Sequence, residues 1–195
     1  TTTVTGGTVT VAGGTLTGAA TVGNATSGTA ILTQTSGSTG AVTVSDRGTL
    51  NASGGTVGAV EAAVDFSGTA ADVNLTGTAV VASLDLNAGA GHVVSNNAEV
   101  TGVVTIDNAT LTQSGAGSKL GTDGTIASTV TVGTTGVLDV NGGMVGAIDN
   151  SGTTTIDSAS ATSLTNTANT SAVNAGGSVT TTTTVTGGTV TVAGG

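Results

Sequence analysis

The sequence of 195 residues contains no cysteine, proline, tryptophan or tyrosine, and its only aromatic residue is Phe66. Without cysteine, no disulfide can hold the fold together. Only 7% of the residues are charged, whereas a globular domain usually carries roughly a quarter. The sequence therefore does not predict a conventional domain built around large aromatic side chains.

Positive charge is also scarce. Arg47 and Lys119 stand against eleven carboxylates, and the formal net charge is −9. A nucleic-acid-binding protein needs a basic surface to neutralise phosphates, so we expect no nucleic-acid partner. No run of about 18 apolar residues occurs, and we expect no membrane span.

Thr, Gly, Ala, Val, Ser and Asn make up most of the chain. Disordered chains are usually rich in Pro, Glu and Lys and poor in β-branched residues, which is the opposite of this composition. Abundant Val and Thr, with a mean hydropathy of +0.36, favour a folded β structure. Depletion of Lys, aromatics and Cys is typical of secreted bacterial surface proteins, so we expect an extracellular or cell-surface location.

One string, TTTVTGGTVTVAGG, occurs twice without a single difference, at 1–14 and at 182–195. Thr1 of the first copy thus corresponds to Thr182 of the second. Compositional bias alone gives approximate echoes, so an identical copy indicates a duplicated unit. We interpret 1–181 as one large tandem repeat and 182–195 as the start of the next, and the sequence as a section of a longer array.

A degenerate motif recurs inside this unit, with weaker copies between the clear ones. The average spacing is about 20 residues, so that about nine rungs fill the unit. The clearest copies are GTVTVAGGTLTGA from Gly7, GTLNASGGTVGAV from Gly48, GHVVSNNAEVTGV from Gly91 and GVLDVNGGMVGAI from Gly136.

Apolar residues alternate with polar ones within the rungs, which predicts strands with one face inward. The fold class expected is all-β, a parallel β-solenoid in which each rung rises about 4.8 Å, so that one unit is roughly 43 Å long. Strand is preferred over helix even at Ala59–Asp65. Corners are predicted at Gly13–Gly14, Gly54–Gly55, Asn96–Asn97 and Asn141–Gly142. The predicted apolar column comprises Val9, Val11, Leu16, Leu50, Val57, Val93, Val100, Ile106, Leu111, Val130, Leu138, Val140, Val145 and Ile148.

The phrases GTVTVAGGTLTG and GVLDVNGG resemble the rungs of bacterial autotransporter passenger domains and haemagglutinin-like exoproteins, especially self-associating adhesins. The similarity extends over nearly the whole chain. It implies a secreted right-handed parallel β-helix that mediates adhesion or aggregation. The chain departs from that pattern by its irregular rung length.

Some β-helices degrade polysaccharides with carboxylates and cationic groups on neighbouring rungs. Arg47 and His92 lie about two rungs apart in the sequence; Asp46 is next to Arg47, and Glu99 is near His92. We favour solvated corner or outward positions for these residues, because a carbohydrate enzyme would also present aromatic platforms. The sequence thus predicts no catalytic residue and no enzyme.

Metal and cofactor sites are not predicted either. No GGxGxD calcium turn occurs, and the aspartates are spread almost one per rung, whereas Ca²⁺ needs six or more converging oxygens. Weak cation binding by a ladder of stacked aspartates remains an open alternative. The aspartates concerned are Asp46, Asp65, Asp72, Asp85, Asp107, Asp123, Asp139, Asp149 and Asp157.

Two further patterns leave alternatives open. Thr-x-Thr pairs could line an ice-binding face, but the series is broken between Ser36 and Ala109, where only Thr76/Thr78 fits. Asn-x-Ser/Thr sequons allow glycosylation, at a frequency expected for this composition. The other Thr-x-Thr pairs are Thr8/Thr10, Thr15/Thr17, Thr110/Thr112, Thr129/Thr131 and Thr153/Thr155. The sequons begin at Asn24, Asn51, Asn74, Asn108 and Asn169.

The function predicted from these patterns is structural. We expect a repeat of a long extracellular fibre or adhesin stalk that associates end to end with identical repeats, with lateral bundling or contact with a cell surface as further options. An ice-binding or carbohydrate-binding β-solenoid is the alternative, and a polysaccharide-degrading enzyme is the least favoured.

Overall fold

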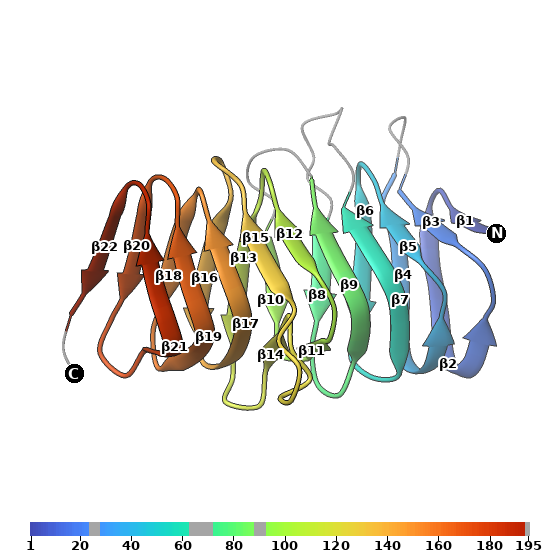
Figure 1. Cartoon of the computed structure of the whole chain (residues 1–195). Helices are drawn as coiled ribbons and strands as arrows, with labels where there is room; N and C mark the ends of the chain where they lie inside the picture. The colour runs from blue at the N-terminus through green and yellow to red at the C-terminus, as the bar shows by residue number, and fades with distance from the viewer. Residues whose placement is uncertain (24–27, 63–71, 88–92, 194–195) are drawn as a thin grey trace.

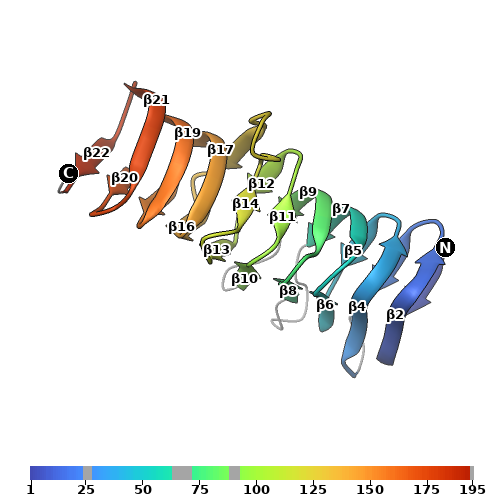
Figure 2. The same cartoon turned by 90° about the horizontal axis from the view of Figure 1, so that it is seen from below.

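The computed structural model describes residues 1–23, 28–62, 72–87 and 93–193, and for Val93–Asn96 it describes the backbone alone. In these residues all regular structure is β, in 22 strands. The strands follow one another around a single axis and pair in parallel with the turns before and after them (Figure 1). The two ends of the chain lie at opposite ends of the resulting rod, as the view from below also shows (Figure 2). The predicted parallel β-solenoid is confirmed.

Each turn contributes to three faces, which we number in the order in which the chain meets them. The first face contains β1 (Thr2–Val4), β3 (Ala20–Val22), β5 (Val42–Val44), β12 (Val104–Ile106) and β15 (Thr129–Val132). The second contains β6 (Gly48–Ala52), β8 (Asp72–Leu75), β10 (Val93–Asn96), β13 (Thr110–Ser114), β16 (Val137–Asn141), β18 (Thr153–Ile156), β20 (Thr170–Val173) and β22 (Thr189–Val192). The third contains β11 (Glu99–Val100) and β14 (Lys119–Leu120).

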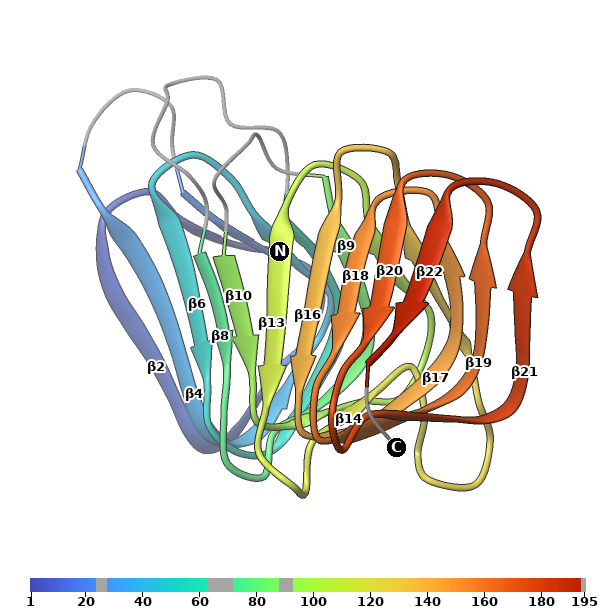
Figure 3. The ribbon, with the colours of Figure 1, turned by 90° about the vertical axis from the view of Figure 1, so that its left-hand side faces the viewer.

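Longer strands bend around a corner and serve two faces, which Figure 3 shows with the C-terminal end of the rod toward the viewer. Their first and second halves pair with different faces of the neighbouring turns. From the second face to the third run β2 (Gly7–Leu16) and β4 (Ala30–Thr39). From the third face to the first run β7 (Thr56–Ala62), β9 (Val80–Leu86), β17 (Gly143–Asn150), β19 (Ala159–Asn166) and β21 (Ser178–Val185).

Strand register links the two ends of the rod through nine steps on the first face. The turns differ in length: the shortest runs from Asn150 to Asn166, and the longest from Ile106 to Val132. The spacing is thus irregular, as the sequence indicated, although the pairing continues through every step. The row runs through Val4, Val22, Val44, Ala62, Leu86, Ile106, Val132, Asn150, Asn166 and Val185.

The inward rows form one continuous apolar core. Most of the predicted column is buried there, while Val9 and Leu16 are partly buried against it and only the backbone is described for Val93. Alternation places Leu and Val inward and Thr outward along most strands, so small turns stack into a largely apolar interior. The confirmed core positions are Val11, Leu50, Val57, Val100, Ile106, Leu111, Val130, Leu138, Val140, Val145 and Ile148.

The predicted corners all fall between the second and third faces. The chain leaves β6 and turns at Gly54–Gly55, and Gly55 has a φ of 78°. A Cβ on Gly55 would overlap the carbonyl oxygen of Gly37 in the preceding turn, so the close stacking itself requires glycine. The prediction was incomplete at Gly13–Gly14, where β2 continues through the corner.

The segment with helical character in the sequence is also a strand where it is described. Its residues 59–62 belong to β7, and 63–65 lie outside the described residues. Helical propensity is too weak here to compete with pairing on both sides. Among the described residues, no helix is long and apolar enough to cross a membrane.

Candidate functional site

Arg47 and Asp46 lie at the corner between the first and second faces. Arg47 is half-buried with a φ of 58°, and Asp46 is buried, which corrects the expectation of a solvated side chain. The inward alternation that buries Val44 and Leu50 runs straight through this corner, so Asp46 takes an inward position. His92 lies outside the described residues, so its predicted solvated position about two rungs from Arg47 stays a prediction.

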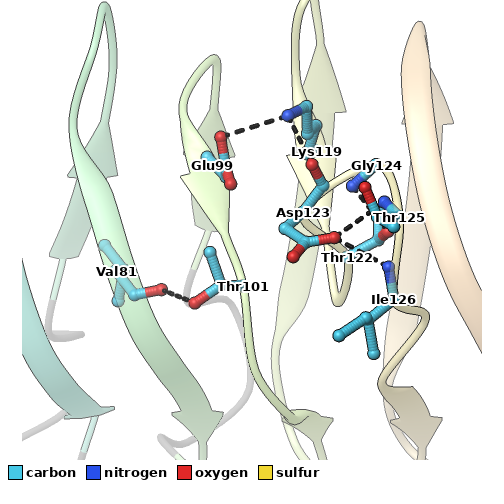
Figure 4. A network of polar contacts seen from close by, with 9 residues as sticks. All are labelled: Val81, Glu99, Thr101, Lys119, Thr122, Asp123, Gly124, Thr125 and Ile126. Atoms are coloured by element: carbon cyan, nitrogen blue, oxygen red, sulfur yellow. Dashed lines mark hydrogen bonds and ion pairs between the residues drawn. The ribbon is translucent and has the colours of Figure 1, made fainter.

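Glu99 pairs with Lys119 on the third face (Figure 4). The two residues are aligned on neighbouring turns, and Lys119 Nζ lies 3.3 Å from Glu99 Oε2. Both side chains are partly solvated, so the pair stabilises the fold by less than about 1 kcal/mol. The carboxylate of Glu99 therefore has a structural cationic partner on the third face.

The turn after β14 is held by Asp123. Its Oδ1 accepts hydrogen bonds of 2.7 Å from the backbone N–H groups of Ile126 and Thr125, and these bonds lower the pKa of the carboxyl (Figure 4). Lys119 Nζ donates to the backbone oxygen of Asp123 at 2.7 Å. The lowered pKa is explained by turn geometry, so it does not mark a reactive group.

Acidic side chains stack on neighbouring turns at one place. Glu61 and Asp85 are register partners on the first face; in the next turn Thr105 is aligned with Asp85, and Asp107 lies two residues further along the chain. Partial loss of hydration, and then the charges of Glu61 and Asp107, raise the pKa of Asp85. Like charges directly opposite each other in a sheet are unfavourable, so this stack costs stability at neutral pH.

The other aspartates do not form a ladder. Asp139 is aligned with Thr112 and Thr155, and Asp149 with Thr131 and Thr165. Threonine thus separates the carboxylates along the rod. The part of the chain that the structure describes contains no cluster of three or more acidic, His or Cys residues able to hold a metal ion, and Asp65 lies outside that part.

The Thr-x-Thr pairs are distributed over different faces. Thr129/Thr131 lies on the first face, whereas Thr110/Thr112 and Thr153/Thr155 lie on the second. Between these last two pairs stands a turn that presents Val137 and Asp139 at the same positions. A flat, uninterrupted threonine face of the kind that ice binding requires is not formed by these pairs.

Three of the sequon asparagines, Asn51, Asn74 and Asn169, are engaged in the fold. The amide of Asn74 donates to Asn51 Oδ1 on the neighbouring turn at 3.0 Å. Asn169, with a φ of 49°, donates from Nδ2 to the backbone oxygens of Ser151 (2.8 Å) and Thr134 (3.1 Å). These side chains hold turns together, which is a structural use of asparagine.

A shallow depression of about 470 Å³ lies at the corner between the second and third faces. It is lined by small residues such as Asn141, Gly142, Ser158 and Gly176, and none of its lining residues is ionisable. Such a surface offers hydrogen-bonding groups without the convergent charged groups of an active site.

Buried glutamines fasten one turn to the next, and sequence reasoning did not identify them. Gln34 Nε2 donates to the backbone oxygens of Thr56 (3.0 Å) and Gly54 (3.2 Å). Gln113 Nε2 donates likewise to Gly142 (2.8 Å) and Met144 (3.2 Å). The tripeptide Leu-Thr-Gln occurs at both places. In each, the glutamine stands two positions after an inward leucine and so falls on the same face of the strand, which was the signal available in the sequence.

Near the C-terminal end the interior becomes polar. Asn150 Nδ2 lies 2.8 Å from Asn166 Oδ1, and Ser171 Oγ donates to the same oxygen at 2.7 Å. Asn166 Nδ2 in turn donates to the backbone oxygen of Gly187 at 2.7 Å. All three side chains are buried, so the network satisfies groups that would otherwise be costly to bury.

The two identical strings occupy equivalent places in the rod. Val4 and Val185 belong to the nine-step row of the first face, and Val11 and Val192 are likewise linked through nine steps on the second face. The offset between the two copies is therefore a whole number of turns.

Comparison of the chain with protein-family models, curated proteins and solved structures finds no match.

Proposed function

We propose that this chain is a structural repeat of a long extracellular fibre or adhesin stalk on a bacterial surface, in which units equivalent to 1–181 continue one another end to end. The observation that carries the proposal is the alignment of Val4 with Val185, nine turns apart and within identical strings. A unit of 1–181 can be followed by another without a change of register, because each turn contacts only its neighbours.

In such an array the function is mechanical. Backbone hydrogen bonds along the axis and the continuous apolar core provide stiffness, and the number of units sets the length, at about 43 Å per unit. The composition and the resemblance to adhesin rungs support the extracellular location. No catalytic role is proposed, since Arg47 lies at a corner and Lys119 on the third face already neutralises Glu99.

A chain of two units, 1–181 followed by 1–195, tests this function. Its rod should be longer than that of the single chain by about 43 Å, measured by small-angle scattering and electron microscopy. The matched control is 1–195 followed by 1–195, which repeats the string TTTVTGGTVTVAGG at the joint. Because this string is shorter than even the turn from Asn150 to Asn166, the insertion shifts the phase and should introduce a bend. Indistinguishable scattering from the two chains would contradict the proposal.

A second measurement separates an adhesive stalk from a passive one. Binding of the purified repeat to cells would assign adhesion to its lateral faces. If the repeat does not bind, adhesion belongs to another part of the fibre, and the repeat serves as a spacer.

A further inference from the structure

Asparagine is followed by glycine at a single place in the sequence, Asn141–Gly142. Asn141 ends β16, and Gly142 joins it to β17, which begins at Gly143. The side chain of Asn141 is exposed, and its Nδ2 donates to Asp139 Oδ2 at 3.0 Å. The carboxamide therefore lies at the surface of the rod, beside the depression of about 470 Å³ between the second and third faces.

The backbone nitrogen of Gly142 is not held by the fold. Gly142 is buried, yet within the described residues its N–H donates no hydrogen bond, which is uncommon for a buried backbone group. Because the residue has no side chain, it also places no steric barrier next to its own nitrogen. This nitrogen is therefore available to attack the side-chain carbonyl carbon of the preceding asparagine.

We propose that Asn141 is a site of spontaneous deamidation, in which Gly142 supplies the attacking nitrogen. This nitrogen gives up its proton to water or hydroxide and bonds to Asn141 Cγ. The Cγ–Nδ2 bond breaks, and Nδ2 takes up a proton from water and leaves as ammonia, so that a succinimide ring remains. Water then opens the ring: attack at the side-chain carbonyl gives aspartate, and attack at the main-chain carbonyl gives isoaspartate, in which the chain runs through the former side chain. The modification goes beyond the proposed function and does not depend on it.

Aspartate precedes glycine at Asp123–Gly124, where the same ring could close, but the fold opposes it there. The N–H of Gly124 donates to Thr122 Oγ1 at 3.0 Å, so this nitrogen is engaged (Figure 4). Asp123 Oδ1 accepts hydrogen bonds from the N–H groups of Thr125 and Ile126, which lower the pKa of the carboxyl and keep it ionised. A carboxylate resists nucleophilic attack, so we expect no ring at this place.

Burial protects an asparagine that also precedes a small residue. Asn150 stands before Ser151 and is buried, and its Nδ2 donates to Asn166 Oδ1 at 2.8 Å and to Ser171 Oγ at 2.9 Å. Loss of this amide as ammonia would remove the donor that these buried oxygens use. The reaction is therefore expected to be selective for Asn141.

A hydrogen bond across the corner restrains the reaction. Gln113 Nε2, in the preceding turn, donates to the backbone oxygen of Gly142 at 2.8 Å. The backbone of Gly142 must rotate before its nitrogen can meet Asn141 Cγ, and this hydrogen bond holds the adjacent peptide group in place. Removal of the Gln113 amide should therefore let the corner open more often and speed the reaction.

Deamidation would loosen this corner permanently. Either product adds a carboxylate two positions from Asp139, and isoaspartate also lengthens the main chain between β16 and β17. The corner has little room for a longer chain, because a Cβ on Gly143 would already overlap the backbone oxygen of Ser118. The Gly142 oxygen should then move away from Gln113, and the modified corner would record the age of the rod.

The test incubates the full folded chain in mildly alkaline buffer, where more of the attacking nitrogen is deprotonated. Cleavage after Arg47 and Lys119 then releases the fragment 120–195, in which tandem mass spectrometry locates every deamidated residue. We expect both aspartate and isoaspartate at position 141, with an equal amount of released ammonia, and an unchanged Asn150. N141Q should not release this ammonia over the same period, because its longer side chain closes a ring less readily.

Two matched variants test the restraint by Gln113. Q113L should raise the rate at Asn141 severalfold, whereas Q34L removes the same kind of hydrogen bond from a distant corner and should leave that rate unchanged. Hydrogen exchange checks that both variants keep the fold. Equal rates in the two variants would contradict the restraint. An intact Asn141 in the folded chain, after an unfolded peptide of residues 138–145 has reacted completely, would overturn the proposal, and so would formation of aspartate without isoaspartate.

Discussion

The same string stands at both ends of the rod, and its two environments differ sharply. Val4 is 3% exposed and Val11 9%, whereas Val185 is 52% and Val192 70% exposed. The difference comes from the turn that follows, which covers the N-terminal copy and has no counterpart beyond the C-terminal one within the described residues. In a solenoid, burial is thus a property of the neighbouring turn as much as of the residue itself.

The largest test of this comparison introduces one charge at equivalent positions. V4D places a carboxylate under the second turn and should lower the free energy of unfolding by roughly 3 kcal/mol or more. V185D leaves its carboxylate largely hydrated and should cost less than about 1 kcal/mol. Urea unfolding of the two variants measures both values. Equal losses would show that the exposed end is covered in solution.

A second pair of variants examines the opposite side of the two copies. Gly7 and Gly188 both have positive φ, so alanine costs about 1–2 kcal/mol at either position. G188A adds the clash with the oxygen of Asn169 and should lose a further ~1–3 kcal/mol in the local stability of 182–193, measured by hydrogen exchange. If G7A proved as damaging as G188A, the N-terminal copy would have to be covered on its open side.

The smallest expected effect is a pH dependence of stability. It should arise at Asp85 in the middle of the rod and not in the terminal string. Because the pKa of Asp85 is raised, the folded state keeps a proton that the unfolded chain releases at pH values between the unfolded and the folded pKa. Stability from this group is therefore present below the ordinary aspartate pKa of about 3.9 and is lost as the pH rises through the folded pKa. D85N should stabilise the rod by about 0.2–1 kcal/mol at pH 7 and not at pH 3, in thermal unfolding.

The string provides the control for this measurement. Thr182–Gly195 has no ionisable side chain, so the opening free energy of its amides should not change with D85N. A change of similar size at both places would indicate that the substitution acts on the whole rod rather than on the stack of Glu61 and Asp85.

Alternation and corner residues carried most of the information that was readable from the sequence. Leu138 and Val140, for example, point inward because strands have a period of two, and Gly54–Gly55 turns the chain because only glycine fits against the turn below. These features are local. They can be recognised without knowing which turns are neighbours.

Register could not be predicted in the same way, because it depends on the length of every corner. An average spacing of about 20 residues would align Lys119 with Asp139. The residues between β14 and β15 lengthen that turn, so Lys119 is aligned with Met144, and Asp139 lies on the second face. The ion pair of Lys119 with Glu99, by contrast, joins residues 20 positions apart, so the average spacing does align them, and this pair was readable from the sequence.

Buried polar side chains were missed because composition suggests that they should be solvated. Asp46 and Gln34 take inward positions that the alternation assigns to apolar residues. Burial of Gln34 is tolerated because two carbonyl oxygens of the next turn accept hydrogen bonds from its Nε2 amide. Such partners become visible only when the register is known.

The unequal turns also determine how the rod would respond to tension. The hydrogen bonds between turns lie along the axis, so a pull on the two ends loads them directly, and the terminal turn detaches first. Each detached turn releases its own length of chain, and the short turn from Asn150 to Asn166 releases less than the long one from Ile106 to Val132. Fully extended, these lengths span roughly 55 to 90 Å. A fibre built in this way would extend in steps of unequal length and would dissipate mechanical energy at each step.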